Sequence, residues 1–213
     1  MLIPLVQGKR GQEQDEVREG SAIELPVLPL RNVVAFPNAL IPLAVGLPRS
    51  LQLLEDVLDD DRLLLLTAMT DPAIEAPGPD QVYQVGTLAQ IERALRLDDG
   101  SFQLVARGLA RVNIVEWVGE EPYLKARAEI YPEQIGDETE IEALRRELLS
   151  LSRRVVNFLP QVPEGIVDML EQVDDPRLLF YTIASNLHLE VAQAQEVLSC
   201  LLYTSPSPRD LST

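Results

Sequence analysis

IERALRLDDGSFQLVA, residues 91–106, is the stretch of this 213-residue chain that decides the fold. Mainly apolar residues recur at every second position from Ile91 to Leu97 and again from Phe102 to Ala106, as in strands with one buried face. Asp99 and Gly100 separate the two runs, and both residue types suit the positive φ that a type I′ turn requires. The stretch therefore predicts two antiparallel strands joined by a tight hairpin.

Residues 123–131 carry a second strand signal, because apolar side chains alternate there with charged ones from Leu124 to Ile130. Short apolar stretches broken by Pro and Gly fill the whole region from residue 22 to residue 132. Residues 1–21 are rich in Gln, Glu and Gly and have no apolar period. We expect a flexible leader over 1–21 and a β-rich domain over 22–132.

One helix is expected inside the β-rich region. Leu47, Leu51, Leu54 and Leu58 recur at helical spacing, and Pro48 is tolerated in a first turn because its missing N–H would be unpaired there. This helix should pack against the sheet. Residues 73–81 hold too many Pro and Gly residues for regular structure, and we expect a surface loop there.

The apolar period changes after Gly136 to alternating spacings of three and four, which predicts a long helix from about Ile141 to Phe158. A short helix is expected over about 164–172, a third after the Asp175-Pro176 pair, and a last one from about Glu190. The helical subdomain is thus predicted over residues 137–198. The fold class is α+β, with strands first and a small helical bundle after them.

Composition narrows the function classes. The 34 Asp and Glu residues against 18 Lys and Arg residues give a net charge of −16, which repels phosphate backbones and makes nucleic acid an unlikely partner. A single cysteine gives no sign of an oxidising compartment. The short apolar patch at the start is no signal peptide, and no apolar run approaches the roughly 20 residues that span a bilayer. We expect a cytoplasmic protein with no membrane partner.

Several ordered segments resemble the N-terminal domain of Lon-type ATP-dependent proteases. The resemblance extends from Glu24 to about Leu198 and departs from the family pattern at Leu47-Pro48, where charged residues are more usual. The matching segments are LPVLPLRNVVAFP (25–37), IPLAVG (41–46), VGTLAQI (85–91), the 99–100 hairpin, GLARVNIVEW (108–117), EEPYLKARAE (120–129) and FYTIASNLHLEVAQAQEVL (180–198).

This resemblance implies a PUA-like β pseudo-barrel with one inserted helix, followed by the helical bundle. It also implies a role in protein quality control: capture of unfolded or tagged protein substrates, and self-association as part of a homohexamer. The ATPase and peptidase domains of such a protease would lie further along the polypeptide, and ATP and Mg would belong to the ATPase domain. We expect no cofactor in this chain.

No residue of this chain is expected to be catalytic. The sequence has no G-x-x-x-x-G-K-[ST] loop to hold ATP phosphates. The family's peptidase uses a Ser-Lys dyad, in which a lysine is the base. Of the two lysines, Lys9 lies in the leader and Lys125 alternates outward on a strand, so neither suits that role.

Candidate substrate-binding residues are Arg31, Asn32, Phe36, Pro37 and Tyr123. In this interpretation Arg31 and Asn32 are polar residues on a binding surface, Phe36 and Pro37 lie on an exposed turn, and Tyr123 anchors a bound peptide. The alternative is packing, in which the prolines set loop geometry and Leu28, Leu30 and Val33 fill the core, with Tyr123 buried in the barrel.

Other polar residues give weaker signals. His188, the only histidine, has no second ligand type nearby and is expected to be a junction residue. The acidic clusters 59–61 and 174–175 lack the spacing of a calcium loop, so we expect no metal site. Residues 199–213, which include Cys200, resemble translated sequencing-adaptor text and are expected to be a non-native tail; an ordinary disordered tail is the alternative.

Two other functions remain open at the level of sequence. A free-standing protein similar to the Lon N-terminal domain would bind or regulate polypeptides without protease activity. An RNA-binding module is conceivable because PUA-like folds bind RNA, but the net charge of −16 counts against it.

Overall fold

A computed structural model describes residues 22–131, 138–156, 166–187 and 189–199. These residues form two compact units. One contains residues 22–131 with 187 and 189–199, and the other contains 138–156 with 166–186. The class is α+β, as predicted. The predicted leader 1–21, His188, Cys200 and the predicted tail after Ser199 lie outside the described residues.

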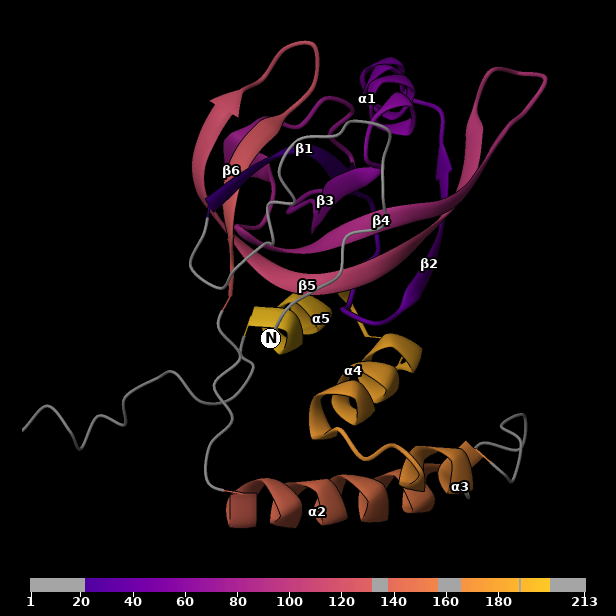
Figure 1. The fold of residues 1–213 in the computed structure, drawn as a ribbon, viewed down its shortest axis with the longest axis vertical. Coiled ribbons are helices and arrows are strands. Elements are labelled where there is room, and N and C mark those ends of the chain that lie inside the picture. The colour runs from indigo at the N-terminus through magenta and orange to yellow at the C-terminus, as the bar shows by residue number, and fades with distance from the viewer. Residues whose placement is uncertain (1–21, 132–137, 157–165, 188, 200–213) are drawn as a thin grey trace, which may run out of the picture. The chain divides into compact units, whose positions relative to one another are not determined.

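Six strands build the first unit (Figure 1). They pair in the order β2-β5-β4-β3-β1-β6, and a further β5–β6 pairing closes five of them into a ring, with β2 attached to β5 as an edge strand. All pairs are antiparallel except β1 with β3. The strands are β1 (Ala22–Leu30), β2 (Leu40–Val45), β3 (Leu63–Ala68), β4 (Val85–Arg96), β5 (Phe102–Gly119) and β6 (Lys125–Ile130).

The β4–β5 hairpin confirms the central sequence prediction, but its turn differs from the predicted type. Of the loop residues only Gly100 has positive φ, at 83°, whereas a type I′ turn needs positive φ at both central positions. The Leu97 amide donates to the Ser101 carbonyl at 2.8 Å, so the loop has three residues rather than two. The carboxylate of Asp99 accepts the Ser101 amide and hydroxyl, and these hydrogen bonds lower the Asp99 pKa. Asp99 thus bonds to Ser101 without the positive φ that a type I′ turn would require of it.

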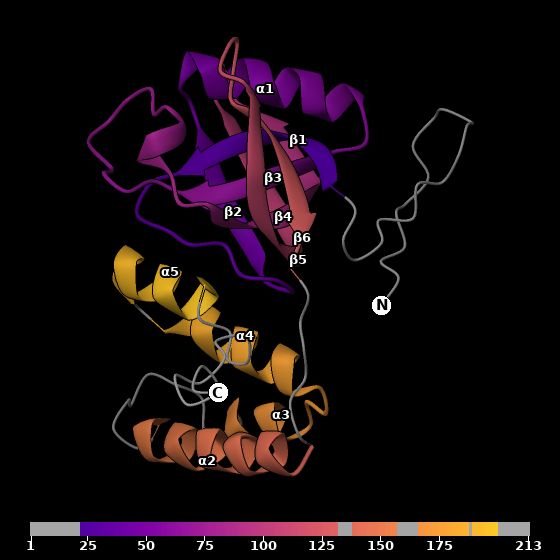
Figure 2. The same ribbon diagram turned by 90° about the vertical axis from the view of Figure 1, so that its left-hand side faces the viewer.

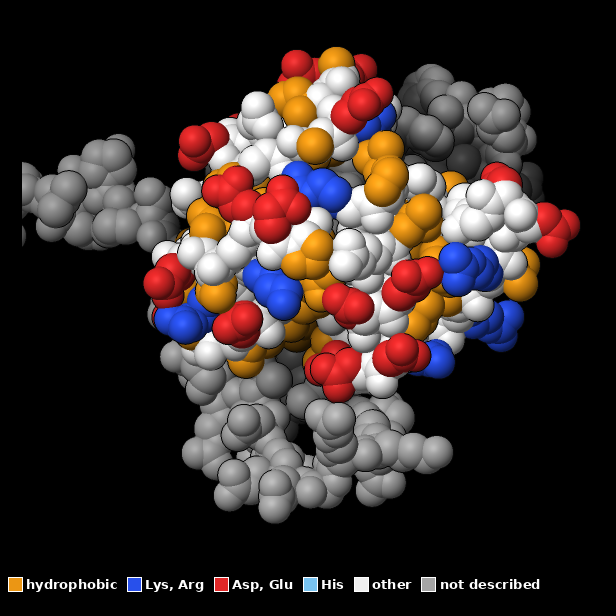
Figure 3. Space-filling view, turned by 90° about the horizontal axis from the view of Figure 1, so that it is seen from above, with side chains coloured by type: hydrophobic (Ala, Val, Ile, Leu, Met, Phe, Trp, Pro, Cys, Tyr) orange, Lys and Arg blue, Asp and Glu red, His pale blue; other side chains and the backbone are white. Residues whose placement is uncertain are grey.

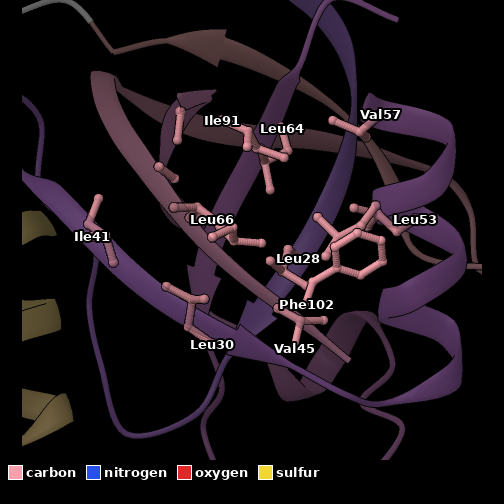
Figure 4. Close-up of a cluster of buried hydrophobic side chains, with 14 of the residues drawn as sticks. Leu28, Leu30, Ile41, Val45, Leu53, Val57, Leu64, Leu66, Ile91 and Phe102 are labelled. Atoms are coloured by element: carbon pink, nitrogen blue, oxygen red, sulfur yellow. The ribbon is translucent and has the colours of Figure 1, made fainter. Parts of the chain in front are cut away.

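Helix α1 (Pro48–Asp59) begins at the predicted proline and packs on the sheet. Its buried face is Leu53, Leu54 and Val57, which meet Leu28 of β1 and Leu64 of β3 in one cluster (Figure 4). Burial of each such side chain stabilises the fold by roughly 1.5–3 kcal/mol. The inserted helix was therefore predicted correctly: Leu51, Leu54 and Leu58 of the expected stripe pack in or against this cluster, and only Leu47 of the stripe is exposed.

The apolar core has two clusters, divided by the alternation of side chains along the strands. On β3, Leu64 and Leu66 belong to the cluster under α1, whereas Leu63 and Leu65 belong to the other cluster. Every residue of β3 is buried, because the strand lies between β1 and β4 and has packing on both faces.

Helix α5 (Val191–Ser199) belongs to the β-rich unit, where α1 and α5 lie at opposite ends in both ribbon views (Figures 1 and 2). This grouping differs from the predicted helical subdomain over 137–198, which includes the segment. Gln195 donates to the Val85 carbonyl of β4 at 2.8 Å. Arg111 of β5 donates to the carbonyls of Leu198, at 3.1 Å, and Ser199, at 3.5 Å. These hydrogen bonds between α5 and the strands explain why the helix groups with the sheet.

Arg111 is the largest of the side chains that are almost fully buried, at 2% exposure. Its guanidinium lies 4.1 Å from the centre of the Tyr131 ring, and no described carboxylate pairs with it. Its positive charge is instead stabilised by the ring and by the carbonyl end of α5, where the helix dipole is negative.

The helical unit contains α2 (Glu138–Val156), α3 (Ile166–Glu171) and α4 (Pro176–Asn186). The Arg145 guanidinium of α2 donates to the Glu171 and Val173 carbonyls at 3.0 and 3.1 Å, which ties α2 to the end of α3. As predicted, Asp175 caps α4: its carboxylate accepts the Arg177 amide at 2.9 Å, and its hydrogen bonds with Arg177 lower its pKa.

Candidate functional site

The first part of the site is the surface where β1 ends. Arg31 and Asn32 follow β1 directly and are exposed, as expected. One terminal nitrogen of Arg31 donates to the Ile74 carbonyl at 3.1 Å, which ties the end of β1 to the 73–81 loop. Asn32 has φ of 56°, a left-handed conformation that asparagine adopts more readily than most residues. The chain turns sharply here and exposes both side chains.

Phe36 and Pro37 do not lie on an exposed turn, so that expectation is wrong. Phe36 is only 3% exposed, and Pro37 is also buried. Thr87 of β4 donates to the Ala35 carbonyl at 2.7 Å, and the Asn38 amide donates to Gly108 of β5 at 2.9 Å. The segment therefore crosses the sheet in direct contact, which no local sequence pattern reveals.

The packing alternative is also only partly right. Leu28 and Leu30 are buried, at 2% and 4% exposure, but Val33 is 38% exposed. Asn32 and Val33 stand at the surface between the buried end of β1 and the buried residues 34–37. The signature segment thus contributes both core and surface.

Tyr123 is buried, at 6% exposure, and has a polar contact at its hydroxyl and a cation near its ring. Its hydroxyl donates to the Asp56 carboxylate of α1 at 2.7 Å, and the Lys125 ammonium lies 5.2 Å from the ring centre. Burial, together with the hydrogen bond and the negative charge of Asp56, raises the Tyr123 pKa to about 12. Tyr123 therefore contributes a rigid wall rather than a mobile anchor.

Alkaline solution is expected to weaken the fold through Tyr123. The unfolded residue ionises near its ordinary pKa of 10.0 and the folded residue near 12, so between these values only the unfolded state loses a proton. The free energy of unfolding should consequently fall as pH rises through this window. Urea titrations at a series of pH values would measure the fall. Tyr123→Phe should flatten it, and an equal slope in that variant would contradict the assignment.

Two hollows meet at the end of β1, and we call them together the Arg31 groove. The first, the α1 pocket, has a volume of about 200 Å³ and lies between β1, the start of α1, the 73–81 loop and Tyr123. The second, the β2 hollow, has a volume of about 490 Å³ and lies between the end of β1, β2 and the start of α1. Both hollows are lined by the same four residues, Pro29, Arg31, Leu47 and Ser50.

The walls of the Arg31 groove are mainly apolar. Leu47 is 37% exposed and Val33 38% exposed, so both present apolar surface to solvent there. Leu53, Met69 and Leu124 line the α1 pocket, and Leu43 lines the β2 hollow. A concave, apolar surface with few polar groups suits hydrophobic side chains of another polypeptide.

A third hollow adjoins the groove through Pro42, Leu43 and Ala44 of β2. It has a volume of about 1120 Å³ and is lined by both acidic and basic side chains. Two of its lining side chains form ion pairs with residues outside the hollow. Arg96 pairs with Glu55 at 3.2 Å, and Glu92 pairs with Arg107. Figure 3 shows a mixed surface on the face seen from above, with acidic side chains spread among exposed apolar ones.

Of the five predicted substrate-binding residues, the structure brings Arg31 and Tyr123 together in the α1 pocket. Asn32, Phe36 and Pro37 line neither hollow of the groove. Leu47, Arg49 and Leu43 also line the groove and were not among the predicted residues. No local sequence pattern marks these three residues, because only the fold brings β2 and the start of α1 beside the end of β1.

Among the described residues, no group of three or more His, Cys, Asp and Glu side chains is placed to hold a metal ion. None of the helices in the described ranges has both the length and the apolar character needed to cross a membrane.

Comparison with known proteins agrees with the sequence resemblance. The chain is 37% identical over 177 residues to a Lon protease of Dictyoglomus thermophilum, which covers 83% of this chain and 22% of that protein. It is 37% identical over 175 residues to Lon protease 2 of Myxococcus xanthus, covering 82% of this chain and 21% of that protein. The chain thus spans only about a fifth of the length of these curated relatives.

A solved structure, the N-terminal domain of the Mycobacterium avium complex Lon protease, has the same fold, with a TM-score of 0.63. It is 22% identical in sequence, and the match covers 84% of this chain and 96% of the other. The family model of the ATP-dependent protease La (LON) substrate-binding domain matches residues 24–201. On these grounds, the chain belongs to the family of Lon substrate-binding domains.

Proposed function

We propose that this chain captures protein substrates for a Lon-type ATP-dependent protease, and that the Arg31 groove is where an exposed apolar segment of the substrate binds. The observation that carries this proposal is the continuity of the two hollows through Pro29 and Leu47, with partly exposed apolar walls. Unfolded proteins expose apolar side chains that folded proteins bury, so a shaped apolar groove distinguishes the two.

The wider setting is also part of the proposal. Cytoplasmic quality control, assembly into a homohexamer, and the need for ATP and Mg in an ATPase domain would belong to the whole protease. The family membership of residues 24–201 supports this setting. Within that setting we assign substrate recognition to this chain, because the family it matches is described as a substrate-binding domain.

Leu47→Asp is the variant that tests the groove. Leu47 lines both hollows and is also the N-cap of α1, where it forms no side-chain capping hydrogen bond. Aspartate is a favourable N-cap, so the change places a charge in the groove while supporting the helix. Removal of one leucine contact worth about 1.5–3 kcal/mol should weaken binding about tenfold or more.

Binding would be measured by fluorescence anisotropy with a labelled, permanently unfolded protein. Val118→Asp is the matched control, because Val118 is 44% exposed on β5 and lines neither hollow. Loss of binding in Leu47→Asp with retention in Val118→Asp supports the proposal. Equal affinity in both variants and the parent chain would rule the groove out.

A further inference from the structure

The charge of the Arg31 groove differs from that of the chain as a whole. The chain carries 34 acidic and 18 basic residues, yet among the described residues Arg31 is the only charged one that lines the β2 hollow. In the α1 pocket the charged lining is Arg31, Arg49 and Glu75. Two cations and one anion therefore line the groove of a strongly acidic protein.

Arg49 is already engaged with the turn before β6. Its guanidinium donates to the carbonyls of Pro122, at 3.3 Å, and Glu120, and it lies 3.9 Å from the Glu121 carboxylate. These contacts fix the start of α1 to the 120–122 turn. Arg49 thus shapes the wall of the pocket, and Arg31 is left as the cation that a ligand can engage.

Arg31 has unused donors. One of its terminal nitrogens donates to the Ile74 carbonyl at 3.1 Å, and Arg31 forms no ion pair with a carboxylate among the described residues. A guanidinium has five N–H donors in a rigid fork, and the remaining donors match the two oxygens of a carboxylate. The Ile74 bond holds this fork at the junction of the two hollows, so its position is preset.

We propose that the groove selects apolar segments that carry a carboxylate, and that Arg31 determines this specificity. This inference rests on the proposed function. The carboxylate would pair with Arg31 at the shared wall while neighbouring apolar side chains occupy the α1 pocket and the β2 hollow. The carboxylate is assigned to an acidic side chain within the segment, because apolar hollows lie on both sides of Arg31. A C-terminal carboxylate offers the same chemistry and is the other outcome of the test.

The experiment uses the 213-residue chain and a set of labelled peptides with one apolar core. The peptides differ only in a flanking Glu, Gln or Lys, and each is made with a free or an amidated C-terminus. Anisotropy titrations at ~50 mM and ~300 mM NaCl separate the electrostatic contribution, because salt screens it. We expect the Glu peptide to bind about two to five times more tightly than the Gln peptide, as for a charge pair with an exposed arginine.

Three variants assign the effect to Arg31. Arg31→Gln should remove the preference for Glu, whereas Arg31→Lys, which keeps the charge, should retain part of it. Arg146→Gln is the control, since Arg146 is 76% exposed in the helical unit and pairs with Glu142 at 2.9 Å. A preference for the free C-terminus over the amide, lost in Arg31→Gln, would identify the terminal carboxylate as the source.

The outcomes separate the two proposals. If all peptides bind with equal affinity and Arg31→Gln changes nothing, carboxylate selection is overturned while capture of apolar segments stands. If no apolar peptide binds the chain, the proposed function fails and the selection fails with it. A Glu preference that persists in Arg31→Gln would place the recognising cation elsewhere and overturn the role of Arg31.

Discussion

Gly108→Ala is expected to lower the free energy of unfolding of the β-rich unit by about 3 kcal/mol. A Cβ atom at this position of β5 would lie 2.3 Å from the Phe36 carbonyl oxygen and 3.1 Å from the Pro37 Cα. Both obstacles are backbone atoms, so neither can rotate away. The Gly108 amide also donates to the Ala39 carbonyl, and the Gly108 carbonyl accepts from the Asn38 amide, each at 2.9 Å. To make room for the Cβ atom, the backbone of residues 36–38 would have to move away from β5.

Chemical unfolding followed by circular dichroism measures this loss. Gly119→Ala is the matched control on the same strand, because a Cβ there meets nothing within 4 Å. It should change the midpoint little or raise it slightly, since alanine restricts the unfolded chain. An unchanged midpoint in Gly108→Ala would mean that the 36–38 segment does not rest on β5 as described.

Arg111→Met should loosen α5 while leaving the strands folded. Methionine keeps much of the side-chain volume but removes the donors to the Leu198 and Ser199 carbonyls and the cation over the Tyr131 ring. Hydrogen bonds from a charged donor are worth about 1.5–3 kcal/mol, partly offset by the relief of burying a charge. Amide exchange in α5 should therefore become about tenfold faster or more.

Hydrogen exchange read peptide by peptide checks this result. Arg146→Met is the control, because the Arg146–Glu142 pair on α2 is exposed and such pairs contribute at most about 1 kcal/mol. Faster exchange confined to 191–199 in Arg111→Met supports the assignment of α5 to the β-rich unit. Equal protection of α5 in the parent chain and the variant would contradict it.

The strands could be predicted well because the alternation that marks them involves only neighbouring residues. The alternation from Leu124 to Ile130 became β6, with each of its predicted apolar positions buried. The Asp99-Gly100 pair correctly indicated the hairpin, yet the turn type depended on hydrogen bonds between Asp99 and Ser101 that the dipeptide alone does not specify. Existence of an element is thus easier to predict than its geometry.

Helix faces were harder to predict, because leucine-rich segments contain overlapping stripes. In α1, Leu51, Leu54 and Leu58 of the expected stripe pack against the core, but the buried face also includes Leu53 and Val57, and Leu47 is 37% exposed. In α2 the buried residue is Leu149, while Leu151 of the expected stripe is 45% exposed. Periodicity finds the helix, whereas the neighbouring element selects the face.

Long-range contacts account for what the sequence could not supply. Burial of Phe36 and Pro37 depends on β5, about 70 residues away, and the grouping of α5 depends on Arg111, 87 residues before Leu198. The Arg31 groove also joins residues from β1, β2 and α1 with Tyr123. Arg31 and Tyr123 could be named as candidates, but their meeting in one pocket follows only from the fold.

The pairing of β1 has a consequence for biosynthesis. One edge of β1 pairs with β3 and the other with β6, which begins only at Lys125. About 100 residues separate the two strands, and at 5–20 residues per second the ribosome needs roughly 5–20 s to make them. Throughout that interval the nascent chain carries a strand whose N–H and C=O groups on one edge lack their partner strand. The ring of strands can close only after β6 has left the exit tunnel.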